Sequence, residues 1–249
     1  MVLMKIINLA KATKMKNIKT IFYFIAIIPL VYSCAPAYTP NMVNTPLFTS
    51  EGEFQATIGT GTSGIDPQLA YAIDDHVGIM LNASFANRTD TNYKNFHKHL
   101  FAELGVGYFL PLGKTGRFEI FGGGGMGSIN AKYENNIFYG RSRALLTRIF
   151  IQPSIGISTS AFDGAFTPRF VFVNINNIKS TENSKTFEPF FEPTLTAKVG
   201  WKYVKMMYQI GLSFPLVELK NYTNQPFMFS IGLMAKIPTN NTSKNKLVD

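Results

Sequence analysis

The 249-residue sequence has little charge and almost no cysteine. Charged residues make up 16% of the chain, well below the roughly 25% that is usual in soluble domains. The single cysteine cannot pair within the chain, which excludes a disulfide scaffold. Hydrophobic residues make up 46%, and this excludes disorder, because disordered chains combine low hydrophobicity with high charge. The composition indicates a folded chain whose surface need not face water everywhere.

Beyond residue 34 the sequence also lacks helical periodicity, an apolar run of 18 residues and any basic run. The formal net charge of +9 falls to +4 if the chain is cut before Cys34, because the part removed holds five lysines and no acidic residue. Much of the positive charge therefore lies in the N-terminal residues before Cys34. It gives no reason to expect a nucleic-acid partner.

The N-terminal residues have the pattern of a secretory signal peptide. Residues 15–20 are basic, residues 21–32 are almost entirely apolar, and Ser33 and Cys34 follow at once. This apolar run is too short for a membrane-spanning helix, which needs about 20 residues. Met15 is an alternative start. The run Val31-Tyr32-Ser33-Cys34 resembles the lipobox of bacterial lipoproteins, although Tyr32 replaces its usual small residue. We therefore expect a lipoprotein signal peptide over 1–33 and lipidation, for example with palmitate, at Cys34.

After Cys34 the recurring pattern is the alternation of apolar with polar or small residues. In Arg143–Ser158, for example, every second side chain is aliphatic or Thr over long stretches, while Arg148 and Gln152 lie on the opposite face. Successive strand side chains point to opposite faces, so one face of each strand is apolar and the other polar. The pattern predicts ten strands, with eight as the alternative count. They are expected near 53–60, 66–73, 76–86, 98–110, 117–131, 143–158, 165–176, 187–200, 202–214 and 226–237.

The predicted connections alternate in length, as in outer-membrane barrels, whose short turns lie in the periplasm. The longer polar connections are 87–97, 132–142, 177–186 and 215–225. The fold class expected is all-β: a closed antiparallel up-and-down transmembrane β-barrel. The expected segments are a signal peptide (1–33), a periplasmic linker (34–50), the outer-membrane barrel (51–238) and a periplasmic tail (239–249). The lipid on Cys34 is expected at the periplasmic leaflet of the bacterial outer membrane, and an even strand count fits this placement, because it returns the tail to the periplasm.

The polar face of the strands carries most of the charge, which favours a membrane barrel over a soluble one. A charge that faces acyl chains costs roughly 2–4 kcal/mol near the membrane midplane, so these residues are expected inside. The expected lumenal charge network consists of Glu103, Glu119, Arg148, Glu192, Lys198 and Lys205, with Glu188 and Arg169 as further members. We interpret it as a plug of ion pairs in a filled small barrel. A polar pathway or ligand site is the alternative.

The sequence resembles the lipid-anchored outer-membrane β-barrel proteins of Bacteroidota, a family of small barrels. The resemblance covers about residues 34–86: Cys34, then the runs Tyr38-Thr39-Pro40-Asn41, Asn44-Thr45-Pro46-Leu47-Phe48, Glu51-Gly52-Glu53 and 68–78. It implies the fold and the location, since most members of this family have no assigned activity. The chain departs from it in having no terminal Phe on the last strand. It also has no acidic run after Cys34, so no surface-export signal is evident.

Motifs for catalysis or cofactor binding are weak. Residues 122–127 match GxGxxG, but no helical pattern follows, so a strand with room for bulky neighbours is expected. Residues 113–115 resemble the end of a P-loop but form a turn. His97 and His99 share a face without a third ligand, and we expect solvated loop histidines and no metal. His76 lies at a predicted periplasmic turn, and no Ser-His pair follows from spacing. Neither catalytic residues nor cofactors are predicted.

Three functions remain open at this point. The leading one is a non-enzymatic structural or surface-interaction barrel, whose partners are outer-membrane lipid and an extracellular ligand or protein that contacts the loops. The second is a narrow channel or a carrier for a small or hydrophobic ligand. The third is a lipid-modifying outer-membrane enzyme.

Overall fold

The computed structural model describes residues 36, 38–89, 95–134, 139–177, 185–219 and 224–237, and it describes no side chains in 133–142, 177 and 185–186. The predicted signal peptide, Cys34 and the tail 239–249 lie outside these residues. All described residues belong to one unit, Ala35–Asp249. Its strands are β1 (Phe54–Gly61), β2 (Ile65–Ala72), β3 (Val77–Thr89), β4 (Phe96–Leu112), β5 (Gly116–Glu134), β6 (Tyr139–Ser158), β7 (Phe162–Asn177), β8 (Lys185–Gly200), β9 (Val204–Leu212), β10 (Phe214–Pro215) and β11 (Phe227–Ile237).

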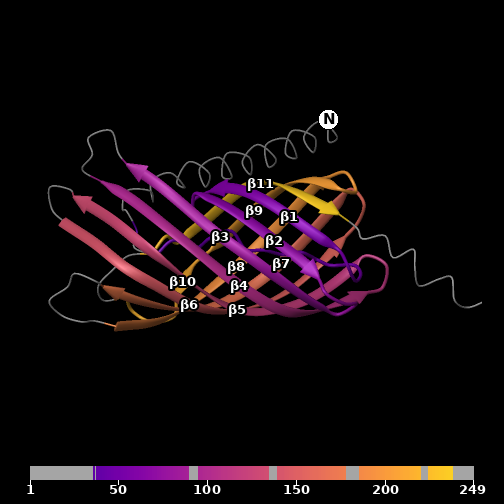
Figure 1. Cartoon of the computed structure of the whole chain (residues 1–249), viewed down its shortest axis with the longest axis horizontal. Helices are drawn as coiled ribbons and strands as arrows, with labels where there is room; N and C mark the ends of the chain where they lie inside the picture. Colours follow the sequence, from indigo (N-terminus) through magenta and orange to yellow (C-terminus); the bar gives the residue numbers. More distant parts are fainter. Residues whose placement is uncertain are drawn as a thin grey trace, which may run out of the picture. The chain divides into compact units, whose positions relative to one another are not determined.

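The strands form one closed antiparallel barrel (Figure 1). Neighbours in sequence pair from β1 to β8, and β8 pairs with β9. Closure comes from β11, which pairs with both β9 and β1. The two-residue β10 continues β9 past Ser213 and pairs with β8, so β9 and β10 act as one interrupted strand. The prediction of an all-β, ten-stranded closed barrel is therefore confirmed.

The connections place short turns at one end of the barrel, which we call the short-turn end: 73–76, 113–115, 159–161 and 201–203. The other end, the long-loop end, has the connections 62–64, 90–95, 135–138, 178–184 and 216–226. Side chains stabilise the tight turns. At 73–76, Asp74 Oδ1 accepts hydrogen bonds from the backbone N–H groups of His76 and Val77, both at 2.7 Å. These two bonds lower the pKa of Asp74, because they stabilise its ionised form.

The strands at the long-loop end are longer than the alternation predicted. Arg88 pairs with His97 and Lys132 pairs with Arg141, so β3 to β6 continue into the predicted loops 87–97 and 132–142. Backbone pairing needs no apolar side chain, and for this reason the ladder extends past the apolar stretch that marks each strand in the sequence.

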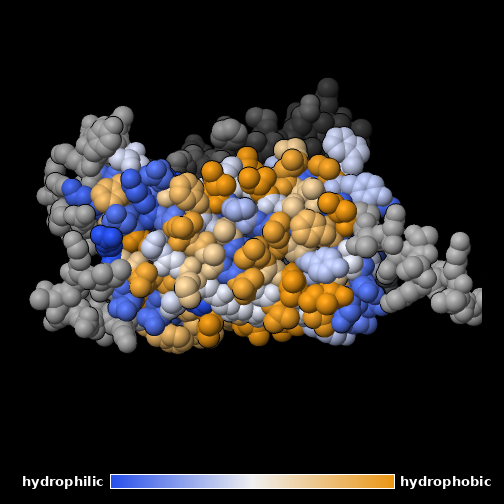
Figure 2. Space-filling view, viewed as in Figure 1, coloured by the Kyte–Doolittle hydropathy of each residue, from blue (hydrophilic) through white to orange (hydrophobic). Residues whose placement is uncertain are grey.

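The outer surface of the barrel carries a broad apolar band, with hydrophilic residues at both ends of the face in view (Figure 2). Outward side chains in the middle of β4 are Leu100, Ala102, Leu104 and Val106, and Leu104 is 65% exposed. Exposed aromatic residues lie near both ends of the strands: Tyr71, Tyr108, Phe166, Trp201 and Tyr203 on the short-turn side, and Phe85, Phe187 and Phe214 on the other. This is the arrangement of an apolar belt between two aromatic girdles.

Candidate functional site in the barrel lumen

The lumen is occupied by a segment of the chain itself. Residues 38–48, which we call the lumenal strap, run along the interior of the barrel before β1 begins. Every residue of the strap except Thr39 is buried, and Tyr38, Val43 and Phe48 have no exposed surface. The expected periplasmic linker over 34–50 is therefore wrong for its described central part. The segment carries no strand alternation, and nothing in its sequence marks it as buried.

The backbone of the strap is satisfied by side chains of the barrel wall. A buried segment that is not part of a β-ladder must find partners for its backbone N–H and C=O groups elsewhere. Gln209 on β9 forms two hydrogen bonds with the backbone of Val43. Its Oε1 accepts from the Val43 N–H at 2.7 Å, and its Nε2 donates to the Val43 carbonyl at 2.9 Å. Gln68 on β2 donates to the Met42 carbonyl at 2.7 Å. Gln152 on β6 donates to the Asn44 carbonyl at 2.7 Å. The polar wall is thus matched to the strap.

Near the short-turn end, two of the charged residues predicted for the lumen also form hydrogen bonds to the backbone of the strap. Lys198 on β8 donates from Nζ to the Thr45 carbonyl at 2.6 Å. Glu119 on β5 accepts from the Phe48 N–H at 2.8 Å. Both side chains are buried, so each binds the strap where water cannot compete.

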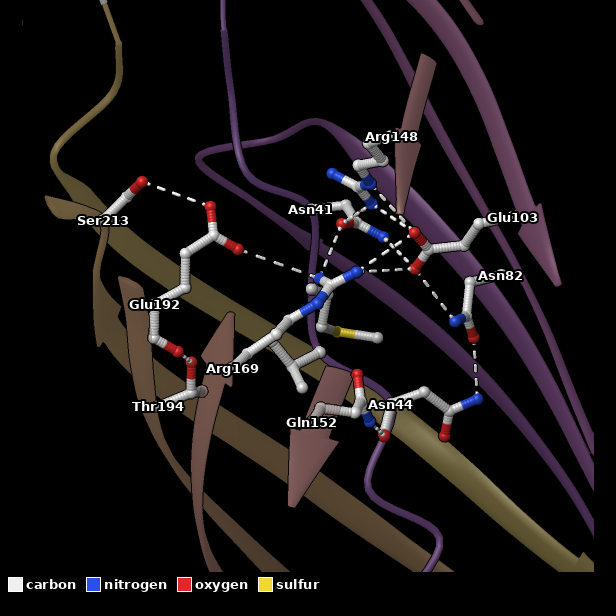
Figure 3. Close-up of polar contacts among 12 residues, drawn as sticks. Asn41, Asn44, Asn82, Glu103, Arg148, Gln152, Arg169, Glu192, Thr194 and Ser213 are labelled. Atoms are coloured by element: carbon white, nitrogen blue, oxygen red, sulfur yellow. Dashed lines mark hydrogen bonds and ion pairs between the residues drawn. The ribbon is translucent and has the colours of Figure 1, made fainter. Parts of the chain in front are cut away.

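The largest cluster of buried charge surrounds the strap at Asn41 (Figure 3). Glu103 on β4 accepts from Arg148 on β6 through Nε at 2.9 Å and Nη2 at 2.6 Å. It also accepts from Arg169 Nη2 on β7, at 3.1 and 3.0 Å to its two oxygens. Arg169 in turn lies 3.9 Å from Glu192 Oε2 on β8. Two carboxylates and two guanidinium groups balance, as buried charges must.

The strap completes this cluster with two of its own side chains. The Asn41 side chain donates to Glu103 Oε1 at 3.3 Å, and its oxygen accepts from Arg148 Nη2 and, at 3.2 Å, from Arg169 Nη1. The Tyr38 hydroxyl donates to Glu192 Oε1 at 2.8 Å. Without the strap, one amide and one phenol partner would be missing from a fully buried ionic cluster.

Apolar strap residues fit where the wall carries glycine. A Cβ at Gly59 on β1 would clash with Met42 Sδ, and a Cβ at Gly78 on β3 would lie 2.6 Å from Phe48 Cε2. Phe48 also packs on the ring of Phe109, with ring centroids 5.2 Å apart. The side chains of the strap can approach the wall this closely because these two positions are glycines and carry no side chain.

The predicted lumenal charges do not form a single network. Glu103, Arg148, Arg169 and Glu192 come together, whereas Glu119 and Lys198 each contact the strap backbone separately. Lys205 instead pairs with Asp163 at 2.7 Å near the short-turn end. Glu188 is also buried, but its Oε2 has no hydrogen-bond partner among the described residues.

Sequence reasoning missed Asp163, because it started the seventh strand at residue 165 instead of Phe162. It also missed the pair of Lys236 Nζ with Glu53 Oε2 at 2.8 Å, since Glu53 was read at the edge of the first strand. The strap itself has two prolines and no alternation, so its sequence gives no signal of burial. The glycine-rich run 122–127 lies in β5, as expected, and Phe101 packs over Gly125 and Gly127.

The histidines of the HxH pair are buried, and the expectation of solvated loop histidines is wrong. β4 begins at Phe96, so His97 and His99 are strand residues that alternate inward with Phe101. His97 Nε2 lies 2.8 Å from His99 Nδ1, and His99 Nε2 lies 2.9 Å from Ser84 Oγ on β3. A cavity of about 20 Å³ beside them is lined also by Tyr38 and Arg148 and has room for about one water.

Neither a metal cluster nor a helical membrane span occurs among the described residues. No three His, Cys, Asp or Glu side chains in the described ranges are placed to hold a metal ion. The described part of the chain likewise contains no helix that is long and apolar enough to cross a membrane.

Comparison with known proteins gives structural likeness without sequence kinship. No family model and no curated protein matches the sequence. The translocator domain of autotransporter NalP from Neisseria meningitidis is similar over 74% of this chain and 86% of its own, with 10% identity and a TM-score of 0.44. The N-terminal β-barrel domain of OprF from Pseudomonas aeruginosa is similar over 76% and 100%, with 11% identity and a TM-score of 0.33. OmpT of Vibrio cholerae is similar over 80% and 100%, with 8% identity and a TM-score of 0.19.

Proposed function

We propose that this chain is an integral outer-membrane barrel that is closed by its own strap and acts as a structural or surface-interaction protein. Its partners in this proposal are membrane lipid around the apolar belt and an extracellular ligand or protein at the long-loop end. The lipid anchor on Cys34 is part of the proposal. The opposite polarity of the two barrel faces supports the membrane assignment: apolar outward in the middle of the strands, charged inward. A soluble barrel would have the reverse.

The observation that carries the proposal is the occupied lumen. Wall side chains on β2, β5, β6, β8 and β9 hold the strap by hydrogen bonds, and the cluster at Asn41 is fully buried. A conducting channel needs a continuous wet path, and a carrier needs a cavity of the size of its ligand. The strap occupies the space that either function would use.

Planar-bilayer conductance tests this proposal. The wild-type protein is expected to give no steady conductance, and deletion of 38–48 is expected to open a channel, because the strap is the only lumenal segment removed. Heat-modifiable electrophoretic mobility of both proteins controls for folding of the barrel. Steady ion conductance of the folded wild type would contradict the proposal and favour the channel.

A second candidate, an acyl hydrolase, rests on one observation: the hydrogen-bonded chain Ser84, His99 and His97, which has the order of nucleophile, base and orienting group. The adjoining cavity has room for about one water and none for an acyl substrate. We therefore expect no labelling of the folded protein by a fluorophosphonate probe. Labelling that Ser84→Ala abolishes would favour the hydrolase.

A further inference from the structure

The two ends of the strap lie at opposite ends of the barrel, and this fixes the direction in which the chain passes through it. At Tyr38, the backbone carbonyl accepts from the N–H of Gln225 at 2.9 Å, and Tyr38 forms a parallel bridge with Asn224. Asn224 and Gln225 precede β11 on the connection at the long-loop end. Thr39 lines the cavity with His97, the second residue of β4 at that same end. The strap therefore begins at the long-loop end.

The other end of the strap leads out at the short turns. Phe48 contacts Glu119, the fourth residue of β5, at the short-turn end. The Glu51 N–H donates to Asp75 in the turn 73–76 at 3.4 Å, and the Gly52 N–H donates to the Ala72 carbonyl at 2.8 Å. From there the chain enters β1 at Phe54 and turns back along the barrel wall. The strap is thus an additional crossing that runs opposite to β1.

The length and fit of the strap agree with a complete crossing. Eleven residues can span at most about 36–40 Å, which is more than the apolar belt of about 25 Å that an outer-membrane barrel presents. A chain that began on the short-turn side would have to pass the lumen twice. The space beside Tyr38 is a cavity of about 20 Å³, which has no room for a returning segment.

We propose that the chain enters the barrel from the outer surface of the membrane, so that Pro36 and Tyr38, at the start of the described part of the chain, lie at that surface. The inference rests on the proposed membrane orientation, in which long loops face outward.

Epitope tags in intact cells test the proposal. One tag is inserted between Ala35 and Pro36, a second in the turn 113–115 at the short-turn end, and a third between residues 90 and 94 at the long-loop end. Antibody binding to intact cells is expected for the first and third tags, and for the second only after the outer membrane is permeabilised. Heat-modifiable mobility verifies that each tagged barrel folds.

The three tags distinguish an error in the path of the strap from an error in the membrane orientation. If the tag before Pro36 behaves like the tag in 113–115 while the loop tag is exposed, the threading is wrong and the membrane orientation stands. If the loop tag is protected and the 113–115 tag is exposed, the orientation itself is wrong. If all three tags need permeabilisation, the barrel is not exposed at the surface and the inference fails with the proposed function.

Discussion

Removal of the Glu103 carboxylate is the perturbation for which the structure gives the clearest magnitude. Glu103 accepts hydrogen bonds from Arg148, Arg169, Asn82 and Asn41, and its side chain is 1% exposed. The variant Glu103→Ala leaves both guanidinium groups buried, with Glu192 as the nearest carboxylate at 3.9 Å from Arg169. Loss of one partner from a buried ionic group costs about 3–5 kcal/mol. At about 1.4 kcal/mol per tenfold change, the unfolding equilibrium constant should rise by roughly two to three and a half powers of ten.

The matched control is Asp163→Ala, which breaks another buried ion pair, that with Lys205 at 2.7 Å. Asp163 contacts Ser158 and Lys205 but no strap residue in the described contacts. Both variants should unfold at lower urea in lipid vesicles, as followed by the fluorescence of Trp201, the only tryptophan. Only Glu103→Ala should also give channel openings, because Glu103, unlike Asp163, accepts a hydrogen bond from Asn41 of the strap. Equal conductance in the two variants, or a loss below about 1 kcal/mol for Glu103→Ala, would refute the reasoning.

Three further changes test other parts of the structure. Gly59→Val should destabilise the barrel by about 1–3 kcal/mol through overpacking against Met42, and Met42→Ala in the same chain should recover part of this loss in urea unfolding; additive losses would contradict the contact. Leu104→Arg, on the outward face of β4, should lower stability in vesicles by roughly 2–4 kcal/mol, whereas no loss would mean that this face does not meet lipid. Cys34→Ser should abolish incorporation of labelled fatty acid, and incorporation that survives the change would show that the anchor lies elsewhere.

The sequence predicts the barrel wall well because period-two alternation is a local property. Leu104 and Glu103 are neighbours in the chain, and their difference in polarity alone assigns them to opposite faces. Closure follows from the same pattern, since a sheet in hydrocarbon must pair both edges. The inward placement of Arg148 and Lys205 also follows from alternation. Alternation does not predict that these two residues have different partners, because the stagger between strands decides which side chains lie at the same height in the barrel.

The strap and the histidine pair could not be predicted in the same way. Whether Asn41 and Tyr38 are buried depends on the width of the lumen and on the amides and charges that line it, which are spread over most strands of the barrel. His97 and His99 lie on the same strand face as Phe101 and Glu103, and this shared face is the sequence signal for their burial. The polar residues around the two histidines indicate a loop instead, which is why the sequence-based prediction was wrong.

A cross-link between strap and wall tests the central claim most directly. In a Cys34→Ser chain, cysteines at 42 and 59 should be joined by a short bis-maleimide, because the Met42 side chain contacts the position that a Cβ at residue 59 would occupy. Cysteines at 59 and 232, opposite one another on β1 and β11, serve as the control in a Met42→Ala chain. We expect cross-linking of both pairs in folded protein recovered from membranes. Cross-linking of the 59–232 pair without the 42–59 pair would show that the strap is not inside the barrel.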